Sequence, residues 1–136
     1  MLFEKYVICD DGFGNITDED GNITGFQVKV RAPYYRAVRL SLVESITLKI
    51  DQHEYSPDEI LFTVADGTFT FDEMKTCYDL YWGFGEPATL TVKRSDGIGR
   101  SFSTGWHNVE VSVVMRIIYA PGGFRATCSK MMYKEY

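Results

Sequence analysis

The strongest pattern in the chain is an alternation of apolar and polar residues near its C-terminal end. Odd positions from 107 to 119 are His, Val, Val, Val, Met, Ile and Tyr, whereas most even positions are polar. A period of two places successive side chains on opposite faces, so the pattern predicts one long strand with an apolar face. Val114 and Ile118 interrupt the polar face. We therefore expect that face to be partly covered, by a partner or by another part of the chain.

The same reading of the other segments predicts an all-β chain with a single short helix. The residues 10–25 form a long loop or an exposed hairpin that turns at Asp20-Gly21, and 51–54 form a turn. Thr70 and Glu73 match a capping box, which predicts a helix that ends near 77 or 78. Further strands are predicted at 2–9, 26–32, 38–50, 60–64, 68–71, 80–84, 88–93, 100–103 and 126–133. About ten strands separated by turn residues predict a two-sheet antiparallel β-sandwich, and nothing divides residues 1–136 into two domains.

Composition and charge exclude several classes of function. The chain carries a net charge of −5 without a cluster of Lys or Arg, so nucleic acid is not an expected partner. It contains no run of 18 apolar residues and no secretory signal, so we expect a cytoplasmic protein without a membrane partner. Three widely spaced cysteines without a CxxC pair predict free thiols in a reducing compartment.

Candidate chemistry is sparse. The two histidines show no metal-binding spacing, and the acidic loop from Asp18 fails as a calcium site because Ile23 and Lys29 occupy its glycine and glutamate positions. His107 opens the long strand on its apolar side and is expected to be half-buried with a satisfied ring. Glu110 and Arg116 are expected to be solvated, subunit-facing or paired across strands. No catalytic, cofactor-binding or metal-binding residue is predicted in this chain.

Aromatic residues make up 15% of the chain, which is more than usual, and many lie at predicted strand ends. Such rings can stack on a sugar, anchor a partner protein, or simply fold over the core. We predict a partner interface that combines these aromatic residues with the interrupted face of the long strand. Its members are Tyr34, Tyr35, Trp82, Phe84, Trp106, Val114, Arg116 and Ile118.

Several motifs along nearly the whole chain resemble one family, the β (small) subunit of bacterial C-glycoside deglycosidases. The motifs are Tyr-Trp-Gly-Phe-Gly-Glu-Pro at 81–87, Leu-Thr-Val at 90–92, Gly-Trp-His-Asn-Val-Glu-Val at 105–111 and Arg-Ile-Ile-Tyr at 116–119. The segments 50–55, 60–64 and 69–73 fit the same family. These motifs are structural rather than catalytic, so no catalytic residue is carried over from the family to this chain.

The resemblance implies a hetero-oligomer with a larger α subunit. That subunit would be a TIM barrel that holds a divalent metal, often manganese, together with a histidine base. The substrate would be a C-glucoside, for example of a flavonoid, already oxidised at sugar C3. Proton abstraction from C2 and elimination would then break the bond from C1 to the aglycone, a lyase reaction. This chain would be accessory, supporting or shaping the site of its partner, and inactive alone.

Two other functions stay open at this point. A stand-alone, lectin-like module would bind sugars through its rim aromatics without any partner. A small independent enzyme would have to build its site from His107, Glu110 or Arg116.

Overall fold

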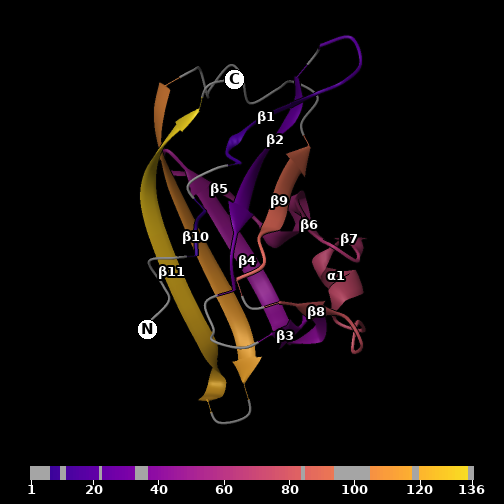
Figure 1. The fold of residues 1–136 in the computed structure, drawn as a ribbon. Helices are drawn as coiled ribbons and strands as arrows, with labels where there is room; N and C mark the ends of the chain where they lie inside the picture. Colours follow the sequence, from indigo (N-terminus) through magenta and orange to yellow (C-terminus); the bar gives the residue numbers. More distant parts are fainter. Residues whose placement is uncertain are drawn as a thin grey trace.

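The computed structural model describes residues 7–9, 12–21, 23–32, 37–83, 85–93, 105–117 and 120–134. Two antiparallel sheets face each other as layers, and one short helix lies beside the end of the first sheet (Figure 1). The prediction of an all-β sandwich with one short helix is therefore confirmed. Within the described residues, no helix has the length and hydrophobicity needed to cross a membrane.

The first sheet has five strands in the order β1-β2-β9-β6-β7. Their bounds are Gly14–Thr17, Ile23–Val30, Ala88–Lys93, Ile60–Val64 and Gly67–Phe69, respectively. β1 and β2 form a hairpin, and Gly21 in its turn has a positive φ of 85°, which a side chain would disfavour. The predicted hairpin turning at Asp20-Gly21 is therefore present.

The second sheet has four strands in the order β11-β10-β4-β5. Their bounds are Ala120–Lys134, Gly105–Ile117, Val43–Ile50 and His53–Tyr55. β10 is the long strand that the alternation predicts, although residues 118 and 119 lie outside the described part. Its odd positions Val109, Val111, Val113 and Met115 are at most 1% exposed and point at the first sheet. The alternating pattern therefore identifies the inner face of β10 correctly.

The inner faces of the two sheets meet in one hydrophobic cluster. The ring of Phe26 on β2 lies 5.2 Å from the ring of Tyr55 on β5, which ties the two layers together. Full burial of one large apolar side chain stabilises the fold by about 1.5–3 kcal/mol. Cys9, Cys77 and Cys128 form no disulfide bond, as the sequence predicts.

The predicted continuous strand over 38–50 is wrong. β3 covers only Val38–Arg39, a 3-10 turn follows at Leu40–Leu42, and β4 begins at Val43. Backbone hydrogen bonds explain the break, because Leu40 N–H donates to the Leu80 carbonyl and Ser41 N–H to the Cys77 carbonyl. β3 consequently leaves the second sheet and pairs with β8, Tyr81–Trp82, in a separate two-stranded sheet.

The helix begins where the capping box predicts. Thr70 Oγ1 accepts from Glu73 N–H at 3.1 Å, and Glu73 Oε1 accepts from Thr70 N–H at 2.8 Å. However, α1 spans only Phe71–Met74, which is shorter than predicted, because Cys77 N–H bonds the Met74 carbonyl three residues back instead of continuing the α-helical pattern. Its inner residues Phe71 and Met74 close one end of the core.

One other predicted element differs from the structure, and two lie wholly or mostly outside the described residues. The predicted turn at 51–54 is tighter than expected, because only Asp51 and Gln52 turn and β5 starts at His53. Most of the predicted strand 2–9 and all of 100–103 lie outside the described residues. Of the former, Ile8 forms an isolated bridge with Val30.

Candidate functional site

The outer face of the second sheet is built by the even positions of β10 and their cross-strand neighbours. Small polar residues fill its centre: Ser112 lies opposite Thr127 on β11 and Thr47 on β4. The Ser112 and Thr127 hydroxyls are 2.9 Å apart and share a hydrogen bond, and the Ser129 hydroxyl donates to Asn108 Oδ1 at 3.1 Å. The alternation that buries one side of β10 therefore presents a row of hydroxyl and amide groups on the other.

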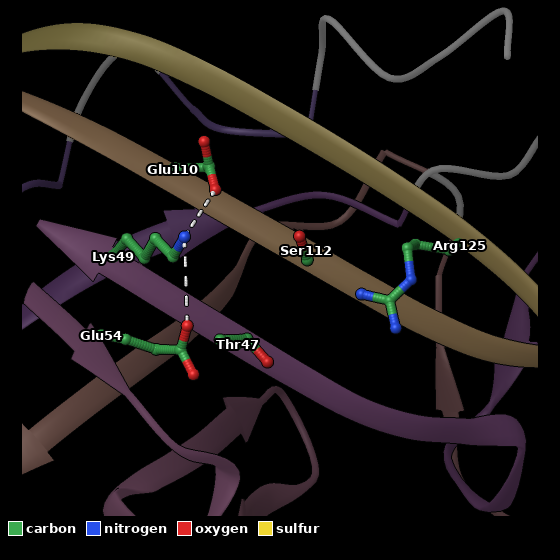
Figure 2. A pocket seen from close by; sticks show the side chains of 6 residues that line it. All are labelled: Thr47, Lys49, Glu54, Glu110, Ser112 and Arg125. Carbon is green, nitrogen blue, oxygen red and sulfur yellow. Dashed lines mark ion pairs between the residues drawn. The ribbon is translucent and has the colours of Figure 1, made fainter. Parts of the chain in front are cut away.

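A shallow polar groove of about 250 Å³ lies on this face (Figure 2). Its lining residues are Thr47, Lys49, Glu54, Glu110, Ser112 and Arg125. Lys49 Nζ sits between two carboxylates, 3.8 Å from Glu110 Oε2 and 4.0 Å from Glu54 Oε1. Exposed pairs of this kind contribute less than about 1 kcal/mol each, so they set the local charge rather than the stability. Within the described part of the chain, the side chain of Arg125 has neither an ion pair nor a hydrogen bond.

Three large apolar side chains gather at one end of the same face. Trp106 is 66% exposed, Met131 56% and Tyr133 48%. Trp106 pairs with Tyr133 across the strands, and their rings meet edge to face with centroids 5.4 Å apart. We call Trp106, Met131 and Tyr133 the apolar corner. It gives an otherwise polar surface an exposed aromatic group that is already ordered by ring-to-ring contact.

On the inner side of β10, His107 and Asp51 form a hydrogen-bonded pair. His107 is 6% exposed, and its Nδ1 lies 2.5 Å from Asp51 Oδ2. Asn108 N–H donates to Asp51 Oδ1 and Asp51 N–H donates to the Asn108 carbonyl, both at 2.9 Å. Asp51 and Gln52 adopt positive φ values of 49° and 77° in the tight β4–β5 turn. The pair therefore links this turn to the start of β10. The expected satisfied ring of His107 is confirmed, although the side chain is buried rather than half-buried.

The hydrogen bonds to Asp51 set its acidity. Burial raises the pKa of Asp51, but the hydrogen bonds from His107 and from Asn108 N–H outweigh it, and the pKa lies below its ordinary value of 3.8. Both bonds favour the carboxylate. The negative charge of Asp51 is consequently part of what stabilises the turn.

Asp51→Asn is expected to lower the free energy of unfolding at about pH 6, and the loss relative to the wild type should shrink at about pH 3. Because the folded-state pKa is lowered, the stabilisation is fully present above 3.8 and is lost as pH falls through the folded-state value. Urea unfolding of both proteins at the two pH values measures the difference. An equal difference at both would contradict a role for the charge.

Comparison with known proteins identifies the family of this chain. A family model described as "C-glycoside deglycosidase beta subunit" matches residues 3–119. The chain belongs to the C-glycoside deglycosidase beta subunit family. It is 36% identical over 118 residues, 87% of this chain and 78% of the relative, to the "C-glycoside deglycosidase beta subunit" of Eubacterium cellulosolvens. It is 28% identical over 120 residues, 88% of this chain and 83% of the relative, to the "3'-dehydrocarminate deglycosidase beta subunit" of a Microbacterium species.

The predicted interface residues of this family member fall into three groups. Tyr34, Tyr35, Phe84 and Ile118 lie outside the described residues. Trp106 is exposed in the apolar corner, Val114 is half-buried, and Arg116 is exposed with its guanidinium donating to the Ser41 carbonyl at 3.1 Å. These three lie on the outer face of the second sheet, where the alternation of β10 predicts Val114 and Arg116.

The structure corrects the prediction that Trp82 belongs to a partner interface. It is fully buried, its ring meets that of Phe62 at 5.1 Å, and its Nε1–H donates to the Glu86 carbonyl at 2.8 Å. Because the side chain is enclosed by this chain, it belongs to the core of the beta subunit and presents no surface to a partner.

Sequence reasoning missed Asp51, Lys49 and Arg125. Asp51 follows directly on a strand and opens a tight turn, which is the only local signal for its role. Lys49 and Arg125 meet Glu110 and Ser112 in the groove only through the register of three strands. Among the described residues, no three His, Cys, Asp or Glu side chains converge as a metal site.

Proposed function

We propose that this chain is the accessory β subunit of a heteromeric C-glycoside deglycosidase. The proposed enzyme cleaves the bond between sugar C1 and an aglycone carbon in 3-oxo-C-glucosides. The observation that carries the proposal is the family match over residues 3–119. The beta-subunit names of both relatives support a second, α subunit in the complex, and the name of one relative specifies a dehydro-glycoside. The family resemblance supports a TIM-barrel fold for that α subunit.

The proposed reaction is an elimination that depends on the 3-oxo group. A carbonyl at C3 acidifies the hydrogen on C2, and a base removes it. The electron pair of that C–H bond forms a double bond between C1 and C2, the pair of the C1–aglycone bond leaves with the aglycone carbon, and that carbon takes up a proton. In this proposal the histidine base and a divalent metal, manganese by resemblance, belong to the α subunit. When bound, the metal would polarise the sugar oxo group.

The candidate catalytic residues of this chain, His107, Glu110 and Arg116, fit a supporting role better than a catalytic one. A general base must come within about 3 Å of the proton that it removes, or reach it through one water. His107 is buried and its Nδ1 is engaged by Asp51. Glu110 forms an ion pair with Lys49, and Arg116 donates a hydrogen bond to the Ser41 carbonyl. The four-stranded sheet is therefore proposed to hold or shape the site of the α subunit.

The complex of this chain with its α subunit is expected to release the aglycone from a 3-oxo-C-glucoside and not from the same glucoside with an unoxidised 3-hydroxyl. The reason is that only the oxidised sugar has an acidified C2 hydrogen. Chromatographic measurement of free aglycone in parallel reactions tests this. Equal release from both substrates would contradict elimination and favour a reaction that does not use the oxo group.

A further inference from the structure

We infer that the outer face of the β11-β10-β4-β5 sheet is the surface on which the α subunit docks. This inference rests on the proposed function, because it takes that subunit as the occupant. We define the docking face as the apolar corner, the central hydroxyl residues and the charged residues beside them. The central hydroxyl residues are Thr47, Ser112, Thr127 and Ser129, and the charged residues are Lys49, Glu54, Glu110, Arg116 and Arg125.

The apolar corner has the composition of a binding hot spot. Trp, Tyr and Met are enriched at protein interfaces, and Trp and Tyr often account for much of the binding energy. Trp106 and Tyr133 already contact each other, so little side-chain freedom is lost when a partner covers them. All three side chains of the corner are close to half exposed or more, which leaves their apolar surface available.

The charges of the docking face differ from those of the chain as a whole. The whole chain has 14 cations and 19 carboxylates, whereas the residues that define the docking face include three cations and two carboxylates. The exposed carboxylate of Glu44 lies beside them at the bulge of β4. Lys49 lies between its two glutamates, and Arg116 donates to the Ser41 carbonyl. Arg125 is thus the cation of this face that has no partner among the described residues. We expect a carboxylate of the α subunit to meet it, because a guanidinium binds carboxylates through two parallel hydrogen bonds.

Burial of the centre of the docking face costs little side-chain conformational entropy. Ser and Thr lose less rotamer freedom than long polar side chains, and their hydroxyls can bond across an interface. β10 and β11 lie side by side along their length, with β4 next to β10 (Figure 1). The 13 residues of β10 give the β10–β11 pair a length of about 43 Å and a width of about 10 Å, and the eight residues of β4 add a third strand over about 26 Å. The resulting area of about 550 Å² approaches the ~800 Å² per partner of a stable interface.

The other group of exposed apolar residues fits a docking surface less well. Leu42, Tyr78 and Tyr81 lie near β3 and β8, on short elements rather than a broad sheet face. There the guanidinium of Arg39 already sits 5.5 Å from the centre of the Tyr81 ring and donates to the Tyr78 carbonyl. Tyr78, 59% exposed, therefore provides a matched control for an aromatic substitution outside the docking face.

The test measures the affinity of the full-length chain for its purified α subunit by biolayer interferometry. Trp106→Ala is expected to raise Kd by at least about 30-fold, and Arg125→Glu by at least about 10-fold. Tyr78→Ala is expected to stay within about 2-fold of the wild type. Circular dichroism of each free variant verifies that it is folded. Arg125→Lys, which keeps the charge, is expected to lose less affinity than Arg125→Glu.

The outcomes separate the docking face from the proposed function. Wild-type chain that does not bind the α subunit would overturn the proposed function itself. Wild-type binding that Trp106→Ala and Arg125→Glu leave unchanged would overturn only the docking face, as would a loss caused by Tyr78→Ala alone. A homodimer of the free chain that Trp106→Ala dissociates would assign the face to a second copy. Binding of glucose by the free chain that Trp106→Ala abolishes would assign it to a glycan, and both results would overturn the inference.

Discussion

Replacing Trp82 with alanine is expected to lower the free energy of unfolding by about 4 kcal/mol, whereas replacing Trp106 with alanine should change it by less than about 1 kcal/mol. Trp82 is fully buried against Phe62, and its indole N–H has a partner in the Glu86 carbonyl. The alanine variant loses that contact and leaves a cavity. Trp106 is two-thirds exposed and contacts Tyr133 at the surface, so its removal creates no cavity in the core.

Urea unfolding of the free chain, followed by circular dichroism, compares these variants. Because small domains are stable by only about 5–15 kcal/mol, Trp82→Phe provides a milder variant that keeps an aromatic ring but loses the hydrogen bond, at a cost of about 1–2 kcal/mol. The order Trp106→Ala, Trp82→Phe, Trp82→Ala is expected for increasing loss. A larger loss from Trp106→Ala than from Trp82→Ala would contradict the assignment of Trp82 to the core.

The two tryptophans also show what the sequence can predict about a surface. Both lie at strand ends among other aromatics, and nothing local distinguishes them. Trp106 lies directly before the alternating run that begins at 107, and the structure places it on the outer face of β10, opposite Tyr133. Trp82 lies in a strand of two residues, which is too short for a period to be visible, and its burial depends on packing against β6.

Local signals predicted the fold well where hydrogen bonds are local or the strand is long. The alternation of β10 and the capping box of Thr70 and Glu73 are examples. The break after Arg39 was not predictable in this way, because it depends on hydrogen bonds from Leu40 and Ser41 to residues some 40 positions away. Apolar residues at 38, 40, 42, 46, 48 and 50 keep one parity through the break and thus resemble a continuous strand.

The same reasoning applies to the site. Asp51 and His107 are 56 residues apart, and only the pairing of β4 with β10 brings them together. The segments that contain them, 50–55 and 105–111, were both part of the family resemblance, but a resemblance alone did not show their contact. Arg125 likewise becomes notable only when the register of β10 and β11 places it beside the groove.

The largest effect on activity is expected from omitting one of the two subunits. The base and the metal of the proposed reaction belong to the α subunit, and in this chain His107 is buried against Asp51. This chain alone should therefore release no aglycone. The α subunit alone should be at least ~100-fold slower than the complex, because a misplacement of about 1 Å in a site that lacks its support costs a factor of this size.

The central claim, that this chain acts only as a partner of an α subunit, is tested most directly by initial rates of aglycone release from a 3-oxo-C-glucoside. The purified chain, the purified α subunit and their equimolar mixture are assayed side by side. We predict release by the mixture, at least ~100-fold less by the α subunit alone and none by this chain alone. Release by this chain alone at the rate of the mixture would contradict the claim.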